Sequence, residues 1–209
     1  MLATSWIHPD DSAYPPVLPS LLGNDAPSRV TVLGDLNILN QKSLALFCSV
    51  KCPGNLILQT YDLAQRLRQS GVTVIGGFHS PMERECLTIL LRGTQPVIAC
   101  PARSLSGMRI PAVYKQPLEQ GRMLLLSPFA DTVRRATVET AMLRNRVVAA
   151  VAGAIFVAHA ELQSKTEQFC REVLAWRKPL YTLADNANGH LLTMGAQPLR
   201  LNDLSLLLR

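Results

Sequence analysis

Short apolar runs alternate with longer amphipathic stretches along most of this chain. The runs are too short for helices and several are rich in valine or isoleucine, so they predict six buried strands: Leu44–Cys48, Val72–Ile75, Val97–Cys100, Met123–Leu126, Ile155–Ala158 and Leu180–Leu183. The stretches between them predict helices at about Leu56–Gln69, Met82–Arg92, Lys115–Gln120, Thr132–Ala152, Thr166–Trp176 and Asn188–Met194. Because such connections are long enough to cross over a sheet, the pattern indicates an α/β fold. We expect a doubly wound, mainly parallel sheet of about six strands with helices on both faces.

Residues typical of helix starts and helix ends support these assignments. Ser80-Pro81-Met82-Glu83 is a capping box with proline at the first helical position, and Ser164-Lys165-Thr166-Glu167 repeats the serine–glutamate spacing. Three glycines follow predicted helices where a left-handed terminating residue is expected: Gly71, Gly93 and Gly153.

The first 40 residues precede this alternation and predict an N-terminal extension packed on the core. Their proline-rich segment Tyr14–Pro19 is expected to be extended. Residues 41–209 are then expected to form the main domain, since no linker or internal repeat divides them.

Composition narrows the class of protein. With 48% hydrophobic and 17% charged residues, the 209-residue chain is typical of a globular protein. Its longest apolar run, Val147–Ala158, is well short of the ~20 residues of a membrane-spanning helix, and the N-terminus lacks the pattern of a secretion signal. We expect a cytoplasmic protein without a membrane segment. The net charge of +6 favours partners that carry phosphate.

Five cysteines lie among apolar neighbours, an odd number that indicates free thiols rather than a disulfide framework. Cys48 and Cys52 have the spacing of half a metal site, but no second pair of ligands stands elsewhere at suitable spacing. A structural role for these cysteines is favoured, and no metal or other cofactor is predicted.

Three unusual loops follow predicted strands, at the edge where open parallel sheets bind ligands. The first, residues 48–55, offers Ser49 and Lys51 near a helix N-terminus, which suits an anion. The second, Gly76-Gly77-Phe78-His79-Ser80, combines glycines that allow close backbone approach with two rings that could contact a base. The third, residues 161–166, places Ser164, Lys165 and Thr166 at a helix start. Each loop has a structural alternative, because turn glycines and capping serines occur in every α/β domain.

Arg144-Asn145-Arg146 lies within a predicted helix, just before a segment that should be buried. Residues two apart point in different directions on a helix, so one arginine is expected to face a site or a carboxylate such as Glu139 or Asp131. We expect Arg144 to face the ligand and Arg146, nearer the apolar run, to be enclosed in an ion pair. The sequence holds no catalytic triad, paired carboxylates or metal-ligand cluster, so no catalytic mechanism follows from it.

Taken in order, the following segments resemble the DprA/Smf DNA-processing family over nearly the whole chain: Tyr14-Pro15, 44–51, 76–80, 93–99, 121–128, 144–146, 164–166 and 195–196. The resemblance implies a Rossmann-like domain that binds single-stranded DNA, commonly as a homodimer, and helps to load a recombinase. The most specific match is Arg144-Asn145-Arg146. The chain departs from the family's Gly-Ser-Arg, which reads Cys48-Ser49-Val50-Lys51, and from its Ser-Gly-Ser-Leu, which reads Leu162-Gln163-Ser164-Lys165. A divergent branch is therefore expected.

The resulting hypothesis is a non-enzymatic, DprA-like protein that binds single-stranded DNA through its phosphates. The phosphate-binding set comprises Ser49, Lys51, the backbone of residues 76–80, Arg144 or Arg146 with Asn145, and Ser164 to Thr166, while Phe78 or His79 stacks on a base. The alternatives are a sensor for a nucleotide derivative and a nucleotide hydrolase similar to the LOG enzymes, whose Pro-Gly-Gly-x-Gly-Thr loop is missing here.

Overall fold

The computed structural model describes residues 4–199, and all six predicted strands are present in it. Each lies within one residue of its predicted bounds, and they form one continuous parallel block. The strands are β3 (Ser43–Phe47), β4 (Thr73–Gly76), β5 (Val97–Ala99), β6 (Met123–Ser127), β7 (Ala154–Val157) and β8 (Leu180–Leu183).

Three further strands make a nine-stranded sheet with the order β1-β2-β6-β5-β4-β3-β7-β8-β9. β2 (Val30–Gly34) pairs antiparallel with β6, and β1 (Ser5–Ile7) pairs antiparallel with β2. β9 (Gln197–Leu199) continues the parallel block beyond β8. The expected mainly parallel, doubly wound fold is confirmed, with more strands than the expected six.

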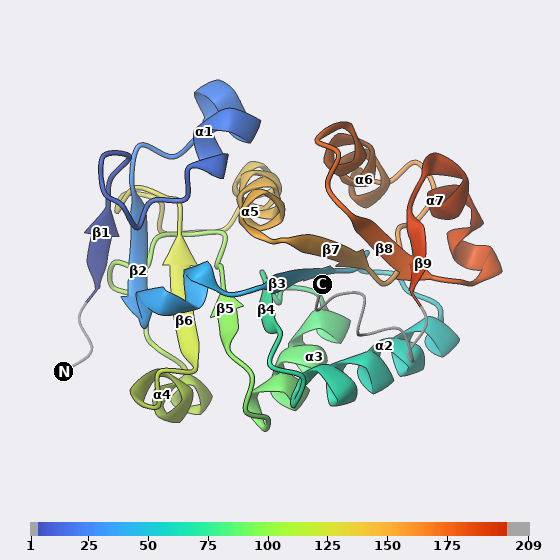
Figure 1. The fold of residues 1–209 in the computed structure, drawn as a ribbon, viewed down its shortest axis with the longest axis horizontal. Helices are drawn as coiled ribbons and strands as arrows, with labels where there is room; N and C mark the ends of the chain where they lie inside the picture. The colour runs from blue at the N-terminus through green and yellow to red at the C-terminus, as the bar shows by residue number, and fades with distance from the viewer. Residues whose placement is uncertain (1–3, 200–209) are drawn as a thin grey trace.

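Helices cover both faces of the sheet (Figure 1). One face carries α1 (Val17–Leu22), α5 (Val138–Val151), α6 (Lys165–Ala175) and α7 (Gly189–Met194), and the other carries α2 (Gly54–Leu67), α3 (Pro81–Leu91) and α4 (Ala112–Glu119). Strand side chains alternate between the two cores: Ala45 and Phe47 of β3 face the first, and Leu44 and Leu46 face the second. Burial on both faces explains why the strands read as unbroken apolar runs. In residues 4–199, no helix combines the length and apolarity that crossing a membrane requires.

Two expected elements differ in the structure. α5 begins at Val138 rather than Thr132, because Thr137 and Thr140 form a capping box that starts the helix there. The proline-rich segment is not wholly extended, since Val17–Leu22 is helical with Pro16 at the N-cap. Short 3₁₀ helices also occur at Gly23–Asp25, Leu36–Asn40 and Asn186–Asn188.

The predicted helix ends are confirmed only in part. Ser80 and Glu83 form the expected capping box, whereas the Glu167 carboxylate accepts from the N–H of Gln163 instead of completing a box with Ser164. Gly71 has the expected positive φ of 75°. Gly93 and Gly153 do not: a Cβ on Gly93 would lie 1.9 Å from the Arg68 carbonyl oxygen, so close packing requires that glycine.

Candidate nucleic-acid interface

The crevice expected for ligands lies between β3 and β7, which are parallel neighbours. The chain leaves β3 through α2 towards β4 and leaves β7 through α6 towards β8, so their loops separate at this point. Ser49 connects the two loops, because its N–H donates to the His159 carbonyl at 2.9 Å and its hydroxyl accepts from the Glu161 N–H at 3.1 Å. Ser49 is 6% exposed, so its role is to hold the two loops of the crevice together. Lys51 stands at the rim with 83% of its side chain exposed, and its Nζ lies 3.8 Å from the Glu161 carboxylate.

A buried carboxylate occupies backbone donors that the sequence suggested for an anion. Glu83 accepts hydrogen bonds from the N–H groups of Cys48 at 3.0 Å, His79 at 2.8 Å and Ser80 at 3.2 Å. The Ser80 hydroxyl in turn accepts from the Glu83 N–H. These donors hold two loops together and are not presented to a phosphate, which corrects that part of the expectation.

The 76–80 loop presents one ring to solvent. Phe78 is 6% exposed, and its ring lies 3.1 Å from where a Cβ on Gly76 would stand. Its place in the core speaks against Phe78 in the expectation that Phe78 or His79 stacks on a base. His79 is exposed and lines a cavity, so it is the ring of this loop that can contact a ligand.

Arg144 is buried, contrary to the expectation that it faces the ligand directly. It is 4% exposed, and its Nη1 donates to the Cys100 carbonyl at 3.0 Å. A Cβ on Gly77 would lie 1.4 Å from that same Nη1. The missing side chain at Gly77 therefore makes room for the guanidinium. Arg144 is buried against the 76–80 loop and does not face the ligand.

Arg146 forms the expected ion pair, with different carboxylates. It contacts Asp25 and Glu172, each at 2.6 Å, and its side chain is 24% exposed. It is thus less enclosed than Arg144, the reverse of the expectation. Of the carboxylates suggested from sequence, Asp131 pairs with Arg29 instead.

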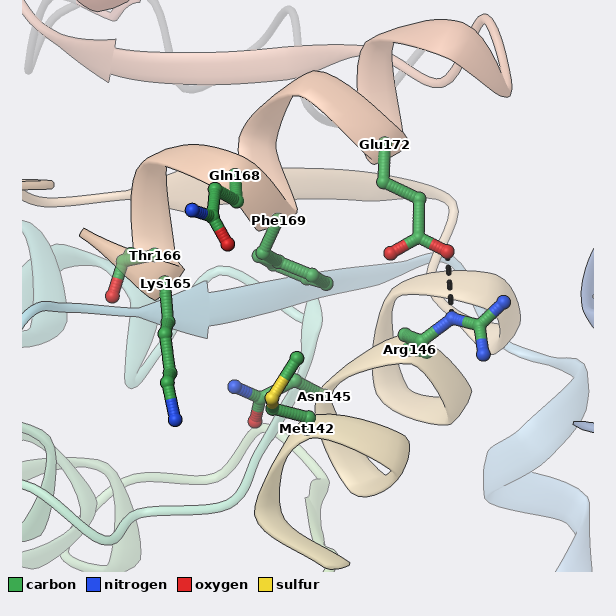
Figure 2. Close-up of a pocket in the computed structure, with 8 residues that line it drawn as sticks. All are labelled: Met142, Asn145, Arg146, Lys165, Thr166, Gln168, Phe169 and Glu172. Atoms are coloured by element: carbon green, nitrogen blue, oxygen red, sulfur yellow. Dashed lines mark hydrogen bonds and ion pairs between the residues drawn. The ribbon is translucent and has the colours of Figure 1, made fainter. Parts of the chain in front are cut away.

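Within this run, Asn145 lines both surface cavities and Arg146 lines one of them. Its Oδ1 accepts from the Arg144 Nε at 2.8 Å, and its amide nitrogen lies on the side of Lys165 (Figure 2). A cavity of about 260 Å³ lies between α5 and α6, and a second of about 500 Å³ runs past His79 and the start of α5. Asn145, Lys165 and Met142 line both cavities. We call the two together the α5–α6 groove.

Figure 2 shows how the first cavity is arranged. Lys165 and Asn145 lie at one end, the Arg146–Glu172 pair lies at the other, and the Phe169 ring stands between them. Thr166 also lines this cavity, whereas the Ser164 hydroxyl accepts from the Glu167 N–H as an N-cap. Close to Lys165, the pKa of Glu139 is lowered, chiefly by a hydrogen bond with Thr137 and also by the lysine charge.

Sequence comparison decides the family. A profile of the family described as DNA recombination-mediator protein A matches residues 5–205. The chain belongs to this family. The predicted resemblance and a role in DNA processing are confirmed by this membership. A comparison with curated proteins gives no match.

Solved structures share the fold of this DNA recombination-mediator chain. DNA processing protein A from Streptococcus pneumoniae matches with a TM-score of 0.78 and 19% identity, over 97% of this chain and 73% of that one. A DNA processing protein A from Helicobacter pylori matches with a TM-score of 0.77 and 20% identity, over 98% of this chain and 95% of that one. That structure is described by its single-stranded DNA binding mode. The molybdenum cofactor carrier protein from Chlamydomonas reinhardtii matches with a TM-score of 0.53 and 12% identity. The match covers 80% of this chain and 98% of that one.

Several residues that line the groove in this family member were not suggested by the sequence. The start of α5 contributes Thr137, Val138 and Met142, and α6 contributes Gln168. The spacing of Thr137 and Thr140 is the one signal that could have located the first group, because it sets where α5 begins and leaves residues 132–137 as a loop beside the groove.

Proposed function

We propose that this chain binds single-stranded DNA along the α5–α6 groove. The observation that carries the proposal is the position of Asn145 and Lys165 where the two cavities meet, beside the crevice at the carboxyl ends of β3 and β7. An amide N–H group and a flexible ammonium suit phosphate oxygens without selecting a sequence. Family membership supports the proposal, as does the binding mode named for the Helicobacter pylori protein.

In this proposal, charged side chains bind the DNA backbone, and rings and apolar side chains contact the bases. Lys165, with Lys51 at the rim, attracts the backbone, and exposed His79 offers a ring for a base. Apolar Val138 and Met142, which are 51% and 45% exposed, give bases a surface to cover. Since the net charge of the chain is +6, the affinity is expected to be mainly electrostatic.

The test is a titration of labelled oligothymidylate, and separately of a mononucleotide, across a series of salt concentrations. Binding of a polymer through several phosphates requires a steep loss of affinity with salt, and Lys165→Ala should reduce that slope by about one. Lys115→Ala removes an exposed lysine of α4 that lines neither cavity and should leave the slope unchanged. Equal affinity for the mononucleotide with a shallow slope would replace this proposal with the nucleotide sensor or hydrolase.

Three further expectations accompany the proposal and rest on the family resemblance alone. They are a homodimer, a recombinase as protein partner and a cytoplasmic location, where single-stranded DNA and recombinase are both accessible. Sedimentation of the purified chain with and without oligothymidylate tests the first of them.

A further inference from the structure

An exposed aromatic ring lies at the outer end of the sheet edge that holds the groove. Trp6 of β1 is 54% exposed. It pairs with Thr31 of β2, which in turn pairs with Ser127, the last residue of β6. Trp6 therefore stands in line with the carboxyl end of β6, and three strand spacings, or about 14 Å, separate β1 from β5.

A guanidinium held by other side chains covers one face of this ring. The Arg29 Cζ lies 4.8 Å from the ring centroid of Trp6. Arg29 also forms an ion pair with Asp131 at 3.0 Å, and Asp131 accepts from the Ser104 hydroxyl at 3.3 Å. A cation over one face holds the ring in place, while the exposure of Trp6 leaves the rest of the ring open to solvent. We call Trp6 with Arg29 the Trp6 platform, and it suits stacking of a flat ring.

Two loops connect the Trp6 platform with the α5–α6 groove. The loop of residues 128–137 reaches the platform through Asp131 and lines the second cavity through Thr137. The loop of residues 101–111 lines the same cavity through Ala102. The platform therefore adjoins the groove by way of these two loops.

The charge of the two loops favours a polyanion. They carry four arginines and a single carboxylate, Asp131, which is already in an ion pair. Two of these arginines, Arg134 and Arg135, are exposed and directly precede the part of the loop that lines the groove. Beyond β1 the exposed residues Asp10 and Asp11 reverse the sign of the charge, so the path that favours phosphate ends at the platform.

We propose that the Trp6 platform is a second contact for the same single-stranded DNA, on which a base stacks after the strand has left the groove across these loops. The proposal rests on the function proposed above and adds a length requirement to it. Oligonucleotides confined to the groove do not reach Trp6, whereas longer ones gain the stacking contact. Since every base has a π face, this contact selects no sequence.

The test measures the affinity of oligothymidylates of about 4 to 16 nucleotides for the wild type, Trp6→Ala and Trp6→Phe. Beyond the length that reaches the platform, Trp6→Ala should bind about tenfold more weakly than the wild type, and Trp6→Phe should recover most of the loss. The shortest oligonucleotides should bind all three proteins equally. Leu58→Ala removes another exposed apolar side chain, on α2 and outside both cavities, and should match the wild type at every length.

Fluorescence provides a readout that a structural role of the ring would not change. In a Trp176→Phe background, Trp6 is the single tryptophan, and long oligothymidylate should quench its emission while short oligothymidylate does not. Equal length dependence in the wild type and Trp6→Ala, or unquenched emission, would overturn this proposal and leave the groove in place. Absence of binding to the wild type at every length would overturn both proposals. Should Trp6→Ala fail to fold, the quenching measurement decides alone.

Discussion

At the scale of single residues, three adjacent side chains on α5 do three different things. Arg144 is buried against Gly77 and the Cys100 carbonyl, Asn145 reaches the groove, and Arg146 holds carboxylates from two other elements. This run was recognisable in the sequence because charged residues just before a buried apolar segment require a ligand or an ion-pair partner. It could not tell which arginine would be covered, since that depends on where β4 and β5 end in space.

Gly77 is the position where a single added methyl group should be most informative. A Cβ there would meet the Arg144 guanidinium at 1.4 Å, so Gly77→Ala should displace it from the Cys100 carbonyl. Loss of a buried, charge-assisted hydrogen bond costs about 2–3 kcal/mol. We expect that loss in urea unfolding, together with weaker binding of oligothymidylate. Gly54→Ala, where nothing lies within 4 Å, is the matched control and should be neutral or slightly stabilising. An unchanged midpoint for Gly77→Ala would contradict this account.

Asn145 allows a test that changes charge and preserves contact with its neighbour. Asn145→Asp keeps an oxygen that accepts from Arg144 Nε but replaces the amide NH₂ group with a carboxylate oxygen. Repulsion of phosphate should lower the affinity for oligothymidylate by about tenfold or more, which corresponds to about 1.4 kcal/mol, and leave the unfolding midpoint nearly unchanged. Asn186→Asp, an exposed site outside both cavities, is the control for net charge. Equal affinity in the two variants would remove Asn145 from the interface.

At the scale of elements, the groove depends on how α5 and α6 begin. Each start is capped by a hydroxyl, Thr137 for α5 and Ser164 for α6, and the first residue of α6 is Lys165. Ser164 was recognisable in the sequence because a glutamate follows at the third helical position. Thr137 was not, because its partner is a threonine and the polar loop before it continues the helical pattern. The sequence therefore predicted α6 closely and began α5 six residues too early.

The start of α6 should also be sensitive to acid. The pKa of Glu167 is lowered by the Gln163 N–H and then by Arg171, so the unfolded chain binds this proton more readily than the folded one. Its contribution to stability is complete above the ordinary pKa of 4.5 and is lost as the pH falls through the lower folded value. Unfolding midpoints of the wild type and Glu167→Gln, compared between neutral and acidic pH, should converge as the pH falls. Parallel curves would show that Glu167 does not contribute in this way.

At the scale of the whole molecule, the sheet is wider than the sequence predicted. The six central strands were recognisable because burial on both faces makes them continuous apolar runs. β1 and β9 have three residues each, and the antiparallel pairing of β2 with β6 joins segments that no local pattern connects. The three loops of the predicted site do follow β3, β4 and β7, but the internal bonds of Ser49, Ser80 and Glu83 could only be seen in three dimensions.

Removal of residues 1–7 tests what the outer strand contributes. Ile7 is 3% exposed, and its loss would cost about 2 kcal/mol. It would also leave β2 as an unprotected edge, so we expect both a lower melting temperature and concentration-dependent light scattering. Trp6→Ser keeps β1 and removes only a half-exposed ring over Arg29, so it should scatter as little as the wild type. A truncated chain with unchanged melting and scattering would show that β1 is dispensable.

The bond between Ser49 and Glu161 joins residues 112 positions apart in the chain. β3 lies early in the sequence, whereas its neighbour β7 follows β4, β5 and β6. Contacts of such long range close slowly, because most of the intervening chain must be ordered first. The crevice should therefore be among the last features to assemble during refolding. Recovery of DNA binding would then lag behind the return of helical signal, and a chain interrupted before β7 would have most of a sheet and no crevice.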